Sequence, residues 1–249
     1  MEIIYTIWLR SMKRYIRSRS RILGSVAMPL FLLLFLGFGL NSIVNTGSLG
    51  QDYSRFLMPG MVSMSVLFTS IFAGVQIIWD KQFGFLKETL VAPVTRLEIM
   101  LGQTAGGATT AVLQGGLLMI LAVLLGLTAA SPAGFAIAFA FMLLIGIAFT
   151  AFGIAIASRM EDMTGFQLIM NFLVFPLFGL SGAFFPISSL PGWFSLLTLL
   201  DPLTYGVEGI RYGLTGVSQI NPAICFGVIG GFAIVISVIG AYLFRKVSV

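Results

Sequence analysis

The sequence has little charge for its length. Only 9% of its 249 residues are charged and 58% are hydrophobic, with a mean hydropathy of +1.03. A soluble domain could not hide that much apolar surface, because about a quarter of the chain's surface stays in contact with water after folding. The composition therefore predicts an integral membrane protein.

Other absences exclude classes of chemistry. Without histidine, the chain has no imidazole for acid–base catalysis or for binding a metal ion. Ser181 stands in a Gly-x-Ser-Gly pattern like that of intramembrane serine proteases, but no histidine could activate it. The one cysteine, Cys225, lies in an apolar run and is expected to be a small buried side chain. The phosphate-binding motif G-x-x-x-x-G-K-[ST] is missing too. We therefore expect no catalytic residue, no metal site and no cofactor bound by this chain.

Long uncharged runs predict an all-α membrane protein with six transmembrane helices. A helix needs about 20 apolar residues to cross a bilayer. The run 99–158 is about three times that length, and Ser131-Pro132 breaks it into a hairpin of two spans. Four more spans fall in the runs 22–41, 56–79, 163–200 and 212–244.

The distribution of basic residues predicts the orientation. Twelve of the fourteen lysines and arginines fall in segments on one side of the predicted spans, and only Arg55 and Arg211 fall on the other. By the positive-inside rule, both termini are expected to be cytoplasmic.

Residues 1–21 are predicted to form an amphipathic helix in the cytoplasmic interface. At about 100° per residue, one arc is apolar, while Arg10, Lys13, Arg17 and Arg21 cluster opposite. Such a helix lies on the membrane with its bases on anionic head groups. A topology signal without a mechanical role is the alternative. The apolar arc holds Ile3, Ile4, Ile7, Trp8, Met12, Tyr15 and Ile16.

The loop WDKQFGFLKETLVAPVTRLEIMLGQ (79–103) concentrates three acids and three bases. After Gly84 it is typical of a short helix that ends at Pro93. A loop that only reversed the chain would need a handful of residues. Its apolar side chains indicate that another surface shields them from water, and this surface is either a protein partner or the lipid head groups.

Two stretches resemble ABC-2 type transporter permeases. FGFLKETLVAPVTRLEIMLGQ (83–103) is similar to their cytoplasmic loop. LSGAFFPISSLPGWFSLLTLLDPLTYGVEGIR (180–211) is similar to the segment between their fifth and sixth spans. Within the family, the likeness is strongest to drug and lipid exporters of the daunorubicin-resistance kind.

The resemblance implies the permease subunit of an ATP-driven exporter in the cell (plasma) membrane. Its substrate would be hydrophobic or amphipathic: a drug, a lipid or a lipid-linked glycan. Its partners would be two copies of a separate ABC ATP-binding subunit, which binds ATP and Mg, a second and identical permease copy, and membrane lipid. No nucleic acid is expected. The coupling loop, 80–98, would contact the ATPase through Phe85, Leu86, Lys87, Glu88 and Leu90.

Two spans carry polar and aromatic stripes at helical spacing. The resemblance implies that both line a translocation pathway at a homodimer interface. The alternative is that their polar groups bond their own backbone or hold helices together. A further stripe, Gln103, Gly107, Thr110 and Gln114, suits helix packing, as do the pairs Gly102/Gly106 and Gly227/Gly231. The pathway residues are Ser65, Thr69, Phe72 and Gln76 in the second span, and Gln167, Asn171, Phe175 and Phe178 in the fifth.

The segment 183–212 contains too many helix breakers for a continuous span. Two short helices, 191–200 and 203–212, are predicted to form a re-entrant hairpin on the external side. Glu208 and Arg211, at i and i+3, can pair. Pro186, Pro191, Glu208 and Arg211 are the predicted external gate.

Two other functions stay open. An ion-coupled secondary transporter would need a carboxylate within the membrane, and the six spans show no clear one. A non-transporting structural subunit would leave the broken segment after the fifth span unexplained.

Overall fold

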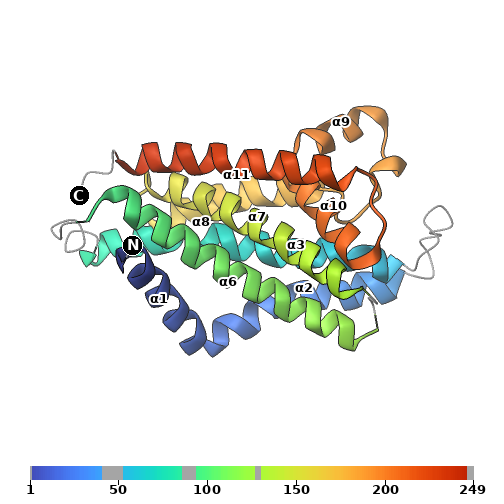
Figure 1. Ribbon diagram of the computed structural model, residues 1–249, viewed down its shortest axis with the longest axis horizontal. Helices are drawn as coiled ribbons and strands as arrows, with labels where there is room; N and C mark the ends of the chain where they lie inside the picture. The colour runs from blue at the N-terminus through green and yellow to red at the C-terminus, as the bar shows by residue number, and fades with distance from the viewer. Residues whose placement is uncertain (1, 41–52, 86–93, 127–129, 246–249) are drawn as a thin grey trace.

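The computed structural model describes residues 2–40, 53–85, 94–126 and 130–245, and every regular element in those ranges is a helix (Figure 1). Six helical segments are long and apolar enough to cross a membrane, which confirms the predicted all-α, six-span fold. The elements are α1 (Glu2–Arg17), α2 (Arg19–Leu40), α3 (Tyr53–Ala73), α4 (Val75–Gln82), α6 (Arg96–Leu124), α7 (Pro132–Ala157), α8 (Met163–Leu180), the 3-10 helix η1 (Ile187–Ser189), α9 (Gly192–Leu200), α10 (Pro202–Thr215) and α11 (Pro222–Arg245).

The hairpin predicted within 99–158 is present. α6 ends at Leu124, and α7 begins at Pro132. The Ser131 side chain caps α7 by accepting a hydrogen bond from the Gly134 N–H at 3.1 Å, and Pro132 needs no donor at this position. Local turn chemistry therefore explains why a 60-residue uncharged run folds into two helices.

The second span consists of two helices in line. The Gly74 N–H donates to the carbonyl of Ile71, three residues back, at 3.0 Å, so the chain tightens between α3 and α4. A Cβ atom at Gly74 would lie 2.5 Å from the backbone of Gly153 in α7. Glycine at both positions allows the two helices to approach this closely.

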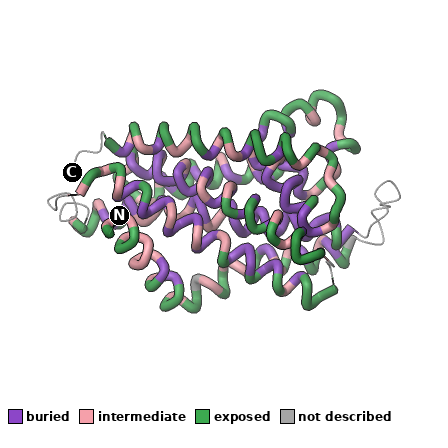
Figure 2. The backbone as a smooth tube through the Cα atoms, viewed as in Figure 1, coloured by how far each residue is buried: buried purple, intermediate pink, exposed green. Residues whose placement is uncertain are grey.

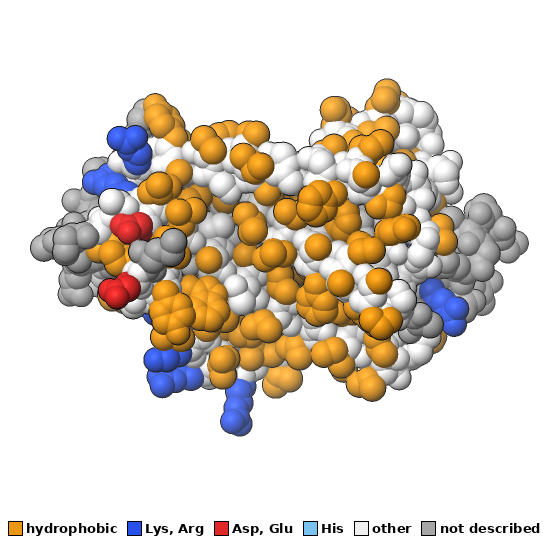
Figure 3. Space-filling model, viewed as in Figure 1, with side chains coloured by type: hydrophobic (Ala, Val, Ile, Leu, Met, Phe, Trp, Pro, Cys, Tyr) orange, Lys and Arg blue, Asp and Glu red, His pale blue; other side chains and the backbone are white. Residues whose placement is uncertain are grey.

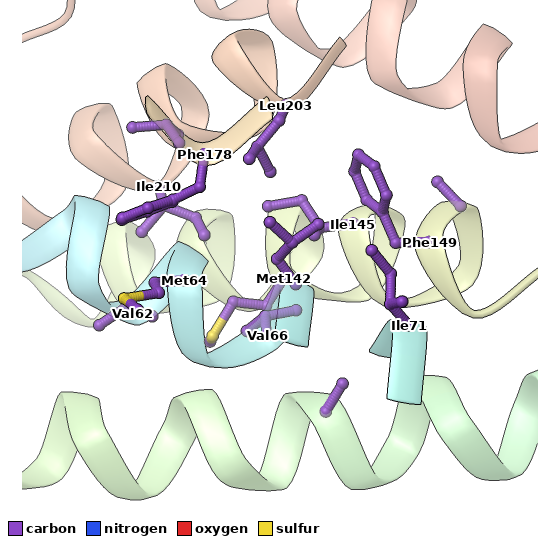
Figure 4. Close-up of a cluster of buried hydrophobic side chains, with 14 of the residues drawn as sticks. Val62, Met64, Val66, Ile71, Met142, Ile145, Phe149, Phe178, Leu203 and Ile210 are labelled. Carbon is purple, nitrogen blue, oxygen red and sulfur yellow. The ribbon is translucent and has the colours of Figure 1, made fainter. Parts of the chain in front are cut away.

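The core lies where α3, α6, α7 and α10 meet (Figure 2). In the α3–α4 span most residues are buried, whereas α2, α8 and α11 are largely exposed. The latter three helices are therefore peripheral and present broad apolar faces to the outside. The inward side chains converge in Figure 4, which labels Val62, Met64 and Val66 of α3, Met142, Ile145 and Phe149 of α7, Phe178 of α8, and Leu203 and Ile210 of α10.

The N-terminal amphipathic helix is present as α1, but it ends at Arg17 rather than continuing through residue 21. It packs against α6, where Gly102 and Gly106 leave room for it. A Cβ atom at these glycines would lie 2.8 Å from Ile7 and 2.7 Å from Ser11. Packing by this pair is thus confirmed. A Cβ atom at Gly227 or Gly231 would meet nothing within 4 Å among the described residues, so no packing role is seen there.

The termini and helix ends that the charge pattern assigns to one side lie at the same end of the molecule. Both termini lie at one end of the molecule, beside the end of α4 and the start of α6 (Figure 1). The Arg96 side chain there donates to the carbonyl of Arg245. Charged side chains lie at the two ends of the molecule and along its lower edge left of centre, and the rest of this face is largely hydrophobic (Figure 3). Which end faces the cytoplasm stays a prediction.

Two short helices follow the fifth span, close to the predicted bounds. α9 and α10 form a hairpin, in which the Thr204 hydroxyl donates to the carbonyl of Thr198 at 2.7 Å. The Tyr205 hydroxyl donates to the carbonyl of Leu199 at 2.8 Å. These bonds satisfy carbonyls at the end of α9 that the helix itself leaves open. That the hairpin re-enters the membrane stays a prediction.

Candidate coupling end and transport pathway

A buried carboxylate joins three helices at the end that holds the termini. Asp80 of α4 is 5% exposed, and its two oxygens accept from the Arg10 guanidinium at 2.8 and 3.3 Å. The Gln76 amide donates to the same carboxylate at 2.6 Å, and the Gln103 amide donates at 3.5 Å. A buried carboxylate is stabilised only when its lone pairs are satisfied, and here α1, α4 and α6 each supply a donor.

Arg10 also contacts the first residue of the predicted ATPase-contacting set. Its guanidinium carbon lies 3.8 Å from the centre of the Phe85 ring, within the range of a cation–π interaction. Phe85 itself is 39% exposed. Arg10 thus links α1 to the start of the coupling loop. The other predicted contacts, Leu86, Lys87, Glu88 and Leu90, lie outside the described residues.

A second connection ties α4 to the turn between α7 and α8. The Lys81 ammonium donates to the carbonyls of Ser158 and Met160 at 2.6 and 3.3 Å. The Gln82 amide donates to the carbonyl of Glu161 at 3.0 Å. The last carbonyls of a helix are unsatisfied and carry partial negative charge, so a lysine suits them. The sequence marks Lys81 as basic, but no local pattern relates it to Ser158.

A polar chamber of about 320 Å³ lies between α1, α4, α6 and α8. Arg14 and Ser11 of α1 form one wall. The side chains of Gln76, Gln103 and Gln167 supply amides from three other helices. Amides both donate and accept, and the arginine adds a positive charge, so the chamber suits a polar or negatively charged group.

An apolar chamber of about 310 Å³ adjoins it, between the start of α2, α3 and α8. Tyr15 and Phe72 line both chambers. The aromatic rings of Phe68 and Phe175 meet edge to face across this chamber, 5.8 Å apart. Ser65 in its wall is 2% exposed, and its hydroxyl has no hydrogen-bond partner among the described residues. The remaining apolar side chains in the wall are Met28, Pro29 and Met64.

The predicted pathway stripes reach these chambers unequally. All four residues of the second-span stripe line one or both of them: Ser65, Thr69, Phe72 and Gln76. From the fifth span, only Gln167 and Phe175 do so. Asn171 is exposed outside both chambers, and Phe178 is buried in the core, 5.0 Å from the ring of Phe184. Whether substrate passes along these surfaces stays a prediction.

The α1 residues in the chamber walls were not among the predicted site residues. The Tyr15 hydroxyl donates to the side-chain oxygen of Gln114, which is fully buried in α6. Gln114 in turn donates to the carbonyl of Ile22 at 3.3 Å. One signal was present in the sequence: the polar stripe of the third span, to which Gln114 belongs, requires a polar partner. That this partner comes from α1 depends on tertiary packing.

The predicted external gate contains a buried ion pair. Arg211 donates to Glu208 at 2.9 Å, as the i, i+3 spacing predicts. Its other nitrogens donate to the carbonyls of Phe56 at 2.7 Å and Gly182 at 2.8 Å. The other Glu208 oxygen accepts from the Gln219 N–H at 2.6 Å. This node fastens α10 to the start of α3, the end of α8 and the start of the sixth span.

Two prolines shape the chain before the hairpin. Pro186 precedes η1, and Pro191 precedes α9, both with extended ψ angles near 140°. They separate three short segments rather than kink one helix. Their part in gating stays a prediction.

Asp201 occupies the turn between α9 and α10. One carboxylate oxygen caps α10 by accepting from the Leu203 N–H at 2.9 Å. The other oxygen is buried and has no partner among the described residues. Burial raises the pKa of Asp201 to about 7, and the bond to Leu203 only partly offsets this. The group therefore titrates near neutral pH.

Comparison with known proteins gives a consistent result. Residues 2–215 match the ABC-2 type transporter family. The chain is 29% identical to Nodulation protein J of Rhizobium meliloti (strain 1021), over 90% of this chain and 86% of that protein. It is 26% identical to Nodulation protein J of Rhizobium leguminosarum bv. viciae, over 96% and 93%. It is 25% identical to the inner membrane transport permease YadH of Escherichia coli (strain K12), over 92% and 89%. With six apolar helices and this match, the chain is a membrane protein of the ABC-2 type transporter family.

Proposed function

We propose that the chain is the membrane-spanning permease subunit of an ATP-driven exporter in the cell membrane. It moves a hydrophobic or amphipathic substrate out of the cytoplasm, and a separate ABC ATP-binding subunit supplies the energy. Permeases of this family are generally paired with such subunits, and the sequence has no P-loop of its own. A second copy of the permease and two copies of the ATPase complete the exporter.

The double attachment of α4 is the observation that carries this proposal. Asp80 and Lys81 are neighbours at the end of α4, yet one is bound to α1 and the other to the α7–α8 turn. Asp80 and Lys81 are also the first two residues of the coupling loop as predicted, 80–98. A push on the loop would therefore reach α1, α6 and α7 together, and the polar chamber lies between α1, α4 and α6.

The mechanism follows from that arrangement. ATP binding and hydrolysis in the partner displace the coupling loop, and α4 moves with it. Because α4, α1 and α6 line the polar chamber, and Tyr15 of α1 also lines the apolar chamber, this movement changes the width of both. Two permease copies then rock between inward-open and outward-open states, with the Glu208–Arg211 node holding the external side closed in one of them.

Co-purification tests the proposal. The detergent-solubilised permease is isolated from its native membrane, and proteins that come with it are identified by mass spectrometry. We expect a protein with the G-x-x-x-x-G-K-[ST] motif in a 1:1 ratio, and ATP hydrolysis by the complex. A permease that transports in vesicles without ATP and follows an ion gradient would support a secondary transporter instead.

A further inference from the structure

Three hollows lie next to one another between the end of α1 and the interior of the bundle, and we call this series of hollows the path. The first is a shallow basic hollow of about 910 Å³ at the junction of α1 and α2, which we call the basic elbow. It shares Arg14 with the polar chamber, and the polar chamber shares Tyr15 and Phe72 with the apolar chamber. Because neighbouring hollows share wall residues, one elongated molecule could contact all three. The cations of the elbow are Arg10, Lys13, Arg14, Arg17 and Arg19.

The charge along this path has one sign. Among the residues that the structure describes, no acidic side chain lines any of the three hollows. Asp80 accepts from Gln76 and Gln103, which line the polar chamber, and Arg10 neutralises its charge. Figure 3 shows basic side chains projecting from the edge of the molecule near the junction of α1 and α2. A surface with one sign of charge beside a low-dielectric wall concentrates ions of the opposite sign.

Arg14 lies between the basic elbow and the polar chamber and lines both. It is half-buried, whereas Lys13, Arg17 and Arg19 are exposed. An arginine binds phosphate or carboxylate through two parallel hydrogen bonds, and basic pockets at the cytoplasmic side of transmembrane helices bind anionic head groups. A negative group that leaves the elbow would therefore meet Arg14 next, together with the amides of the polar chamber.

The apolar chamber offers a site for the rest of such a molecule. Its volume of about 310 Å³ is at the low end for drug-sized ligands, so it suits a slender body. Ser63 and Ser70 on the same helix donate to backbone carbonyls, but the buried Ser65 hydroxyl has no partner. A buried hydroxyl without a partner is costly unless a ligand or water satisfies it. Ser65 could therefore bond a polar group near the apolar body, such as an ester oxygen.

We propose that this path selects an anionic membrane amphiphile, whose negative head group passes from the basic elbow to Arg14 while its apolar body enters the chamber walled by Ser65, Phe68 and Phe175. This inference rests on the proposed transport function and narrows its substrate class. Neutral and cationic amphiphiles gain nothing from the basic side chains of the elbow other than Arg10, whose charge Asp80 offsets.

Photocrosslinking in nanodiscs of phosphatidylcholine tests it without ATP or a partner. Two photoactivatable probes, a phosphatidic acid and a phosphatidylcholine, carry the same diazirine-labelled chain. We expect the phosphatidic acid to label the peptides around Ser65 and Met28 about tenfold more strongly, the size of one charge-assisted hydrogen bond. Outward residues of α11, such as Ile234 and Val238, should be labelled equally by both probes.

Matched variants assign the preference to Arg14. Arg14→Gln should remove the preference for phosphatidic acid, and Arg14→Lys should retain most of it. Arg55→Gln removes a positive charge at the other end of the molecule and should leave the preference unchanged. If Arg14→Gln does not fold, Thr69→Trp fills the chamber instead and should lower chamber labelling several-fold.

The possible results separate this inference from the proposed function. Equal chamber labelling by both probes, or a preference that survives Arg14→Gln, would overturn the inference. If an ATPase co-purifies and chamber labelling is equal, the exporter stands and its substrate is of another class. If labelling discriminates and no ATPase is found, the site is an anionic-lipid site outside ATP-driven export.

Discussion

At the residue scale, two nodes of buried, paired charge lie in the described part of the chain, one toward each end of the bundle. Asp80 and Arg211 are both buried, and each binds partners from several helices. The Glu208–Arg211 pair could be predicted because the two residues are one helical turn apart. The Arg10–Asp80 pair could not, because 70 residues separate its members and only the packing of α1 on α6 brings them together.

The Arg10–Asp80 pair gives a prediction about stability. Arg10→Gln should destabilise the protein by about 2 kcal/mol, because Asp80 stays buried and loses its cation. Asp80→Asn should cost a similar amount. Their combination should cost less than the sum, since neither charge is then left alone. Thermal unfolding in detergent measures all four proteins. Strictly additive losses would show that the pair is not coupled.

Asp201 gives a prediction about pH. Its pKa is raised from 3.8 to about 7, so the folded protein holds a proton that the unfolded chain releases. The resulting stability is complete below pH 3.8 and is lost as the pH rises through about 7. The thermal midpoint should therefore fall between pH 5 and 8. The thermal midpoint of Asp201→Asn should fall less, because asparagine keeps the helix cap but has no proton to lose in this pH range. Equal pH dependence of the two proteins would contradict the assignment.

Element by element, local signals predicted much of the fold. Ser131-Pro132 predicted where α7 begins, and the two helices of the hairpin fell close to their expected bounds. Amphipathic spacing predicted α1 as a helix but not the surface that it covers. An apolar arc is equally suited to lipid and to protein, and only the glycines of α6 decide between them. Of the fifth-span stripe, Gln167 and Phe175 line the chambers and Asn171 does not. Spacing predicts which residues share one face of a helix, but it does not predict the direction in which that face points.

The contact between α1 and α6 gives a prediction at this scale. Gly106→Leu should push α1 away, because even a Cβ atom there would lie 2.7 Å from the Ser11 side chain. Overpacking of this kind costs about 1–3 kcal/mol. Trypsin should then cleave faster at the basic residues of α1. Gly227→Leu is the matched control, since its Cβ atom meets nothing within 4 Å. Equal cleavage rates in the two variants would contradict the packing role of Gly106.

At the scale of the whole molecule, the basic segments that the sequence assigns to one side of the membrane lie at one end of the structure. Neither the charge pattern nor the structure shows which end faces the cytoplasm. Composition and run length were sufficient for the membrane class and for six spans, because both depend on apolar length alone. The adjoining chambers were beyond prediction, since their walls come from six helices, α1, α2, α3, α4, α6 and α8, whose relative positions the sequence does not specify.

Labelling in intact cells tests the orientation. Cysteine is introduced singly at Lys13, Lys87, Arg245 or Gln51 in a Cys225→Ala background, and the cells are treated with a membrane-impermeant thiol reagent. We expect labelling at position 51 only, because the other three lie in the basic segments. All four positions should react after the membrane is permeabilised. Labelling of position 87 in intact cells would reverse the topology.

The central claim is that a separate ATPase drives the permease through the coupling loop. Burying Leu86 in the partner would contribute about 1.5–3 kcal/mol, so Leu86→Ser should weaken the complex by roughly ten- to a hundredfold. Glu88→Gln should have a smaller effect, within about 1 kcal/mol, because exposed ion pairs contribute little.

The most direct measurement is recovery of the ATPase by affinity-tagged wild-type, Leu86→Ser and Glu88→Gln permeases at equal membrane abundance. We expect Leu86→Ser to insert normally but to recover little ATPase and to show no substrate-stimulated ATP hydrolysis, while Glu88→Gln stays near the wild type. Equal recovery of the ATPase by wild-type and Leu86→Ser permease would contradict the claim and would place the loop on the lipid head groups instead.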